Sequence, residues 1–112
     1  MAKDLNYTML LDVYGSLLTE KQTETLDYYY NDDLSLGEIS EEMGITRQGV
    51  MNCIKKSEQR LSELEESMGL VKRFTELKEI VEQLEDEIRS AVISDDRLTK
   101  IKQLVADIKS KL

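Results

Sequence analysis

Apolar residues recur every three or four positions along most of the chain, which is the spacing that places them on one side of an α-helix. In the first such stretch, residues 5–18, they are Leu10, Leu11, Tyr14, Leu17 and Leu18. A second helix should begin after Thr19, because Thr19 and Gln22 can each cap the other's backbone N–H group. Its inward residues would be Leu26, Tyr29 and Tyr30. Asn31, Asp32 and Asp33 should end it, since such side chains compete for backbone hydrogen bonds.

The segment 35–60 predicts two helices joined by a tight turn. Ser35 and Glu38 form a second capping pair, before a short helix with Leu36, Ile39 and Met43 on its buried side. Gly44 can take the left-handed conformation that such a turn needs, and Ile45 should lie in the angle between the helices. Thr46 can then cap a further helix, whose inner residues would be Val50, Cys53, Ile54 and Leu61. This combination is typical of a helix-turn-helix.

The C-terminal part of the sequence predicts two more helices that fold back on each other. Gly69 should end the preceding helix. An apolar seam with alternating spacings of four and three follows, through Leu70, Phe74, Leu77, Val81, Leu84, Ile88 and Ala91. Ser94, Asp95 and Asp96 interrupt it and cap a last helix with a seam of Leu98, Ile101, Val105, Ile108 and Leu112. The short break favours an antiparallel helical hairpin.

The expected architecture is therefore all-α, with a helix-turn-helix domain over residues 1–68 and a helical hairpin over residues 69–112. The hairpin would serve in dimerisation or partner binding. Its apolar seam must be covered either by the N-terminal helices or by a second copy of the chain. Because 112 residues can bury only a limited core, we expect a homodimer.

The composition argues against an enzyme. Histidine is absent, which removes the commonest general base and metal ligand, and Cys53 is the only cysteine. No glycine-rich phosphate loop is present. Carboxylates such as Glu82, Glu85, Asp86 and Glu87 alternate with apolar positions, as on a solvated helix face. We expect no catalytic residue, cofactor or metal, and we interpret Cys53 as a small core residue.

The sequence also predicts a cytoplasmic protein. Asp4 and Asp12 interrupt the short apolar run at the N-terminus, so it does not have the form of a signal peptide. No stretch reaches the roughly 20 apolar residues that cross a bilayer. A single cysteine without a disulfide partner fits a reducing compartment.

A candidate nucleic-acid-binding surface lies on the helix that follows Thr46. The chain has 15 Lys and Arg against 23 Asp and Glu, a net charge of −8, but residues 46–60 contain four basic residues and one acidic residue. If the aliphatic residues face inward, the outward side carries Arg47, Gln48, Met51, Asn52, Lys55, Lys56 and Arg60. Arg, Gln and Asn at the start of such a helix can read base edges, whereas the later basic residues would meet phosphates.

Two other interpretations of this pattern remain open. The outward residues can be merely the solvated side of an amphipathic helix, since Glu63, Glu65 and Glu66 soon reverse the charge. Alternatively, the protein is an acidic adaptor that uses an acidic C-terminal hairpin to engage a basic partner, such as a targeting GTPase or its RNA–protein particle. The helix-turn-helix would then be only a scaffold.

Four segments of the chain resemble region 4 of bacterial sigma factors, in which a helix of this kind reads promoter DNA. They are Leu18-Thr19-Glu20-Lys21-Gln22, Leu26-Asp27-Tyr28-Tyr29-Tyr30, Leu34-Ser35-Leu36-Gly37-Glu38-Ile39-Ser40 and Gly44-Ile45-Thr46-Arg47-Gln48-Gly49-Val50. The chain as a whole is similar to the YlxM family of small bacterial proteins, most strongly over residues 5–74. That resemblance implies a helix-turn-helix regulator linked to the signal recognition particle pathway, with DNA, RNA or particle components as partners.

Overall fold

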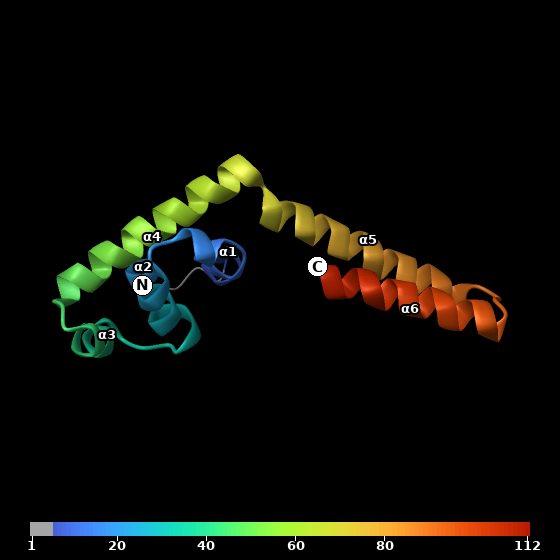
Figure 1. Ribbon diagram of the computed structural model, residues 1–112, viewed down its shortest axis with the longest axis horizontal. Coiled ribbons are helices and arrows are strands. Elements are labelled where there is room, and N and C mark those ends of the chain that lie inside the picture. Colours follow the sequence, from blue (N-terminus) through green and yellow to red (C-terminus); the bar gives the residue numbers. More distant parts are fainter. Residues whose placement is uncertain (1–5) are drawn as a thin grey trace. The chain divides into compact units, whose positions relative to one another are not determined.

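The computed structural model describes residues 6–112, all of whose regular elements are helical (Figure 1). In chain order these are α1 (Asn6–Tyr14), the 3₁₀ turn η1 (Gly15–Leu17), α2 (Glu20–Leu26), the π-helical turn η2 (Asp27–Asn31), α3 (Leu36–Met43), α4 (Arg47–Met68), α5 (Leu70–Ser90) and α6 (Asp95–Lys111). The all-α prediction is confirmed. None of the helices in this part of the chain combines the length and apolar character of a membrane span.

Local hydrogen bonds set the starts of α2, α3 and α4 as the sequence predicts, whereas Ser94 precedes α6 without the predicted capping hydrogen bond from its side chain. The Thr19 and Ser35 side chains accept the backbone N–H groups of Gln22 and Glu38, whose side chains accept the N–H groups of Thr19 and Ser35 in return. Thr46 Oγ1 accepts the N–H group of Gly49 at 2.9 Å at the start of α4. These bonds satisfy backbone donors that a first helical turn leaves without a partner.

Two glycines end the helices α3 and α4. Gly44 has φ 67° and Gly69 has φ 61°, the left-handed conformation that a residue with a Cβ adopts only at a cost. After Gly44, the Ser40 hydroxyl donates to the backbone carbonyl of Ile45 at 2.5 Å, which ties the turn to α3. The turn of the helix-turn-helix is thus held from both sides.

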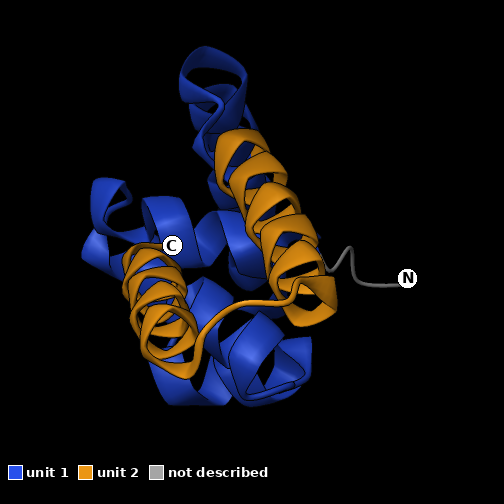
Figure 2. Cartoon of the chain, turned by 90° about the vertical axis from the view of Figure 1, so that its right-hand side faces the viewer, with its two compact units in different colours: residues 1–71 blue, residues 72–112 orange. Residues whose placement is uncertain are grey.

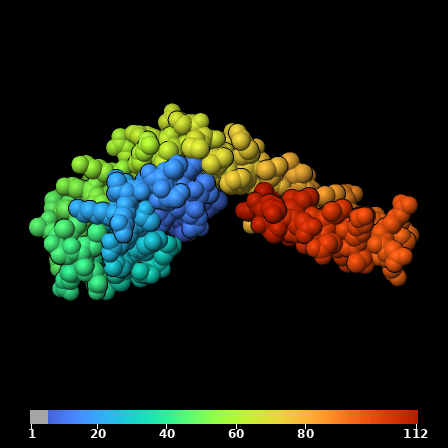
Figure 3. Space-filling view, viewed as in Figure 1, coloured from blue at the N-terminus to red at the C-terminus, as the bar shows by residue number. Residues whose placement is uncertain are grey.

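The chain forms two compact units, residues 1–71 and residues 72–112 (Figure 2). In the first unit, α4 packs against α1, α2 and α3, and the space-filling view shows the N-terminal helices pressed against α4 (Figure 3). The fully buried apolar side chains come from all four helices: Tyr14, Leu26, Ile39, Val50 and Leu61. Because α4 supplies two of these buried side chains and contacts all three of the other helices, it is the central element of this unit.

Leu17 is a correction to the predicted inward face of the first helix. The spacing assigned it to the core, but 53% of its surface is exposed, whereas Leu18 is buried. The α-helix ends at Tyr14 and the chain continues through the 3₁₀ turn. A 3₁₀ turn winds three residues per turn instead of 3.6, so the α-helical spacing no longer applies to Leu17. Residue 5, the predicted first residue of this helix, lies outside the described residues.

Cys53 is half-buried, not part of the core as the sequence suggested. Its thiol donates to Thr25 Oγ1 at 3.4 Å, and Thr25 in turn donates to the Lys21 carbonyl at 2.7 Å. Cys53 therefore lies at the polar edge of the contact between α2 and α4.

In the second unit, α5 and α6 form a helical hairpin with a small core of its own. Val81, Ile88 and Val105 are buried between the helices, and Ile93, Leu98 and Ile101 pack against them. Other residues of the predicted seam are not buried there. Leu70 packs in the first unit, while large parts of the surface remain exposed at Phe74, Leu77, Leu84, Ile108 and Leu112.

Candidate nucleic-acid interface

The aliphatic side of α4 faces the core, and its polar side therefore faces outward. Val50, Ile54 and Leu61 are at most 3% exposed. The six polar residues of the predicted surface are all exposed: Arg47, Gln48, Asn52, Lys55, Lys56 and Arg60. Met51 is half-buried at the edge of that surface. The structure thus brings the predicted residues together on the outward side of one helix.

The centre of this outward face is formed by Gln48, Asn52 and Lys55. An α-helix turns by about 100° per residue, which places these three residues opposite the buried side of α4. Gln48 Nε2 donates to Asn52 Oδ1 at 3.1 Å, so the two amides form a pair along the helix. Each amide keeps a further donor and acceptor, the combination that pairs with an adenine edge in a major groove.

Arg47 lies at the α3 edge of the surface. A Cβ atom added at Gly37 of α3 would come within 3.0 Å of Arg47 Nη2 and 3.2 Å of Arg47 Nε. The guanidinium group therefore lies against the backbone of Gly37 and remains open to solvent. A side chain at position 37 would therefore require the exposed end of Arg47 to shift by a few tenths of an ångström.

Gly49, in the first turn of α4, also has a local role. A Cβ at this position would lie 3.2 Å from Thr46 Oγ1, tighter than ordinary van der Waals contact. The missing side chain leaves room for the cap at the start of α4.

The cationic surface ends after about four turns of α4. Arg60 forms an exposed ion pair with Glu63, with 3.9 Å between Arg60 Nη1 and Glu63 Oε2, and exposed Glu66 follows one turn later. An exposed pair of this length contributes little stability, but it places a negative charge beside Arg60. Lys55 and Lys56 are exposed and appear in none of the ion pairs of the described residues.

The net negative charge of the chain lies in a different place from the one predicted. Residues 72–112 contain nine basic and nine acidic residues, so the hairpin is neutral and not acidic. Residues 6–46 contain nine acidic residues and Lys21, a net charge of −8. All nine carboxylates are exposed: Asp12, Glu20, Glu24, Asp27, Asp32, Asp33, Glu38, Glu41 and Glu42.

The acidic surface of α2, η2 and α3 affects its neighbours. Loss of solvent and the nearby carboxylates of Glu24, Glu42 and Asp32 raise the pKa of the Tyr28 phenol above its ordinary value. The first helix of a helix-turn-helix crosses the DNA backbone, so Glu38, Glu41 and Glu42 on α3 would oppose close approach of phosphates. The usable cationic surface is therefore confined to α4.

Among residues 6–112, no three His, Cys, Asp or Glu side chains converge as metal ligands would. The chemistry of the surface on α4 is that of hydrogen bonds and charge.

Comparison with known proteins agrees with the helix-turn-helix that the structure shows. A family model described as "UPF0122: Putative helix-turn-helix protein, YlxM / p13 like" matches residues 1–111. A UPF0122 protein of Halalkalibacterium halodurans is 40% identical over 102 residues, which span 91% of this chain and 94% of the relative. A UPF0122 protein of Acetivibrio thermocellus is 45% identical over 94 residues, 84% of this chain and 80% of the relative.

Proposed function

The chain belongs to the UPF0122 family of YlxM- and p13-like helix-turn-helix proteins, and from this premise we propose that it is a regulatory nucleic-acid-binding protein. The observation that carries the proposal is the exposed, cationic and amide-bearing face at the start of α4. Arg47, Gln48 and Asn52 would contact base edges, and Lys55 and Lys56 would contact phosphates, with Met51 and Arg60 at the margins. The ligand is DNA or RNA. The proposed role is binding and not catalysis.

The resemblance to YlxM proteins extends the proposal to the signal recognition particle pathway, in which the protein would act in the cytoplasm as a regulator. A homodimer would present two α4 surfaces, and helix-turn-helix dimers bind paired half-sites in this way.

The test uses pools of randomised 30-base-pair DNA duplexes and of random RNA, with retention on immobilised protein as the readout. The variant Lys55→Ala/Lys56→Ala should retain at least tenfold less of the bound pool, because two phosphate contacts are lost. It should also flatten the slope of log K against log salt by about 2. The matched control Lys78→Ala/Lys102→Ala removes the same charge from the hairpin and should bind like the parent.

Glu41→Gln/Glu42→Gln should strengthen retention in the same assay, because two charges that repel phosphate are removed from α3. Equal retention of both pools by the parent and by Lys55→Ala/Lys56→Ala would overturn the proposal.

A second candidate function, a protein adaptor, is favoured by the net charge of −8 on residues 6–46. Such a surface attracts a basic partner and speeds its association. The partner would bind α2 and α3 and not the neutral hairpin. In-cell crosslinking with separate identification of RNA, DNA and protein separates the two functions: the adaptor requires protein crosslinks that Lys55→Ala/Lys56→Ala leaves unchanged and Glu41→Lys/Glu42→Lys removes.

A further inference from the structure

The α5–α6 hairpin exposes more large apolar side chains than it buries. Only Val81, Ile88 and Val105 are buried between its two helices, which have 21 and 17 residues. The large apolar side chains that the hairpin leaves exposed are Phe74, Leu77, Ile80, Leu84, Val92, Leu104, Ile108 and Leu112. Scattered exposed apolar residues are ordinary, so their arrangement decides whether they form a surface.

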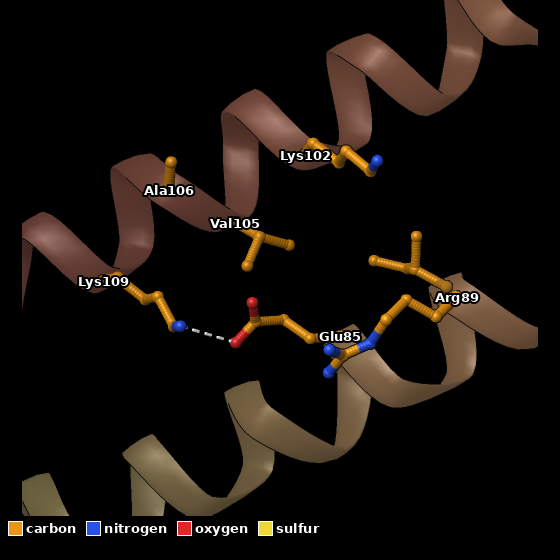
Figure 4. A pocket seen from close by; sticks show the side chains of 7 residues that line it. Glu85, Arg89, Lys102, Val105, Ala106 and Lys109 are labelled. Carbon is orange, nitrogen blue, oxygen red and sulfur yellow. Dashed lines mark ion pairs between the residues drawn. The ribbon is translucent and has the colours of Figure 1, made fainter.

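One face of the hairpin is polar. Glu85 and Arg89 of α5 and Lys102 and Lys109 of α6 line a shared hollow (Figure 4). Lys109 Nζ lies 2.7 Å from Glu85 Oε1, an ion pair between the helices. This pair shows which side of each helix belongs to the polar face. Around the α5 axis, Glu85 lies about 40° from the buried Val81. Around the α6 axis, Lys109 lies about 40° from the buried Val105, on the same side of the hairpin.

The opposite face of the hairpin is apolar. On α5, Leu77 and Leu84 lie about 40–60° from Val81 on the side away from Glu85, and Ile80 lies about 100° away. On α6, Ile108 and Leu104 lie about 60° and 100° from Val105 on the side away from Lys109. Because the helices are antiparallel, both groups fall on one face, where they are 42–60% exposed. This apolar face is defined by Leu77, Ile80, Leu84, Leu104 and Ile108.

We propose that the apolar face of the hairpin binds the same face of a second copy, so that two hairpins form an antiparallel four-helix bundle. Helices of this length, packed 8–10 Å apart, present a face of about 20 by 25 Å, which is about 500 Å² per copy. The pair would therefore bury about 1,000 Å² or more, the lower limit of a specific interface. This deepens the homodimer named above and does not depend on nucleic-acid binding.

The charge pattern of the hairpin favours a second copy over an unrelated partner. With nine basic and nine acidic residues in 72–112, two hairpins do not repel each other. Next to the apolar face, the edge of α5 carries Arg73 and then two acidic residues, Glu76 and Glu87, all exposed. The corresponding edge of α6 carries three basic residues, Arg97, Lys100 and Lys111, and the acidic Asp107 lies about 20° further from the apolar face.

A two-fold axis parallel to the helices would place α5 of each copy beside α6 of its partner. Glu76 and Glu87 would then lie along the basic edge of the other copy, twice in the dimer. Such flanking charges select the partner and the orientation in helical bundles. The same face thus has both an apolar centre and complementary margins for its own copy.

The experiment measures the mass of the full chain by light scattering over a concentration series, without nucleic acid. The parent should approach twice 12.9 kDa. Ile80→Lys and Leu104→Lys should remain monomeric, because each places a charge in the centre of the apolar face. The matched control Ala106→Lys lies on the polar face and should dimerise like the parent. Circular dichroism verifies that the helix content is unchanged, as expected at exposed positions.

The charge pattern is tested separately. Glu76→Lys/Glu87→Lys should weaken dimerisation at least tenfold, and adding Lys100→Glu/Lys111→Glu should restore it. A parent mass that stays at 12.9 kDa would overturn the proposal, and so would a dimer that all variants preserve. Since Lys55→Ala/Lys56→Ala should leave the mass unchanged, failure here is distinguishable from failure of nucleic-acid binding.

Discussion

Single polar contacts tie the tyrosine-rich η2 turn to α4. The Tyr30 hydroxyl donates to Glu58 Oε1 at 2.5 Å, and the Tyr30 ring packs edge-on against Tyr29 with 5.0 Å between centroids. Burial, followed by the hydrogen bond and the charge of Glu58, raises the pKa of the Tyr30 phenol well above its ordinary value. Tyr30 is thus held in its neutral, donating form.

This contact predicts a pH-dependent difference for Tyr30→Phe. The raised pKa means that the stabilisation is present below pH 10, the ordinary value, and is lost as the pH rises above it. At pH 8 the variant should be less stable by about 1–2 kcal/mol, the effect of a hydrogen bond to a charged group at a partly exposed site. The difference should narrow between pH 10 and 11.5. Melting curves that stay parallel over this range would contradict the assignment.

At the scale of elements, side chains of the first unit hold the start of α5. The buried Tyr14 hydroxyl donates to Glu65 Oε1 at 2.6 Å and accepts the N–H group of Leu70 at 3.0 Å. Glu65 Oε1 also accepts the N–H group of Val71 at 3.0 Å. A carboxylate at this place satisfies free N–H groups of the first helical turn and complements the helix dipole. Glu65 of α4 therefore connects this helix both to α1, through Tyr14, and to the start of α5, through Val71.

Replacing Glu65 with alanine should destabilise the first unit by about 2 kcal/mol, because two donors lose their acceptor. All five tyrosines lie in residues 7–30 and the chain has no tryptophan, so tyrosine fluorescence in a urea titration reports on this unit alone. Glu66→Ala, the exposed neighbour, is the matched control and should change the stability by at most about 0.5 kcal/mol. Equal midpoints for the two variants would show that the network contributes nothing.

At the scale of the whole molecule, charge is divided unevenly between the units. The segment 6–46 carries −8, whereas α4 and the hairpin are each balanced. The repulsion among exposed carboxylates of α2, η2 and α3 opposes folding of the first unit, and salt screens it.

Raising NaCl from 20 to 500 mM should therefore stabilise the first unit by about 0.5–1 kcal/mol, measured by tyrosine fluorescence during thermal unfolding. Glu41→Gln/Glu42→Gln should raise the midpoint at low salt and reduce the response to salt. A midpoint independent of salt in the parent would exclude this account of the acidic surface.

Much of the architecture could be derived from residue patterns, because helix periodicity and capping are local. Thr19, Ser35 and Thr46 act as caps where their short polar side chains predicted them, and Gly44 and Gly69 end helices as expected. Helix periodicity also predicted which residues of α4 face outward, once its apolar residues were assigned to the inward side. The charge of the hairpin also follows from residue counts, which make it neutral, so the prediction of an acidic hairpin was wrong.

Other features depended on how helices meet in space. No pattern showed that a 3₁₀ turn would expose Leu17, that Arg47 would lie against Gly37, or that Tyr14 would reach Glu65. The apolar seam on α5 and α6 could be recognised from the spacing of its residues. That spacing does not predict which of these residues are buried by the other helix. Periodicity reports the side of a helix that avoids water, while burial and pairing depend on packing between segments distant in the chain.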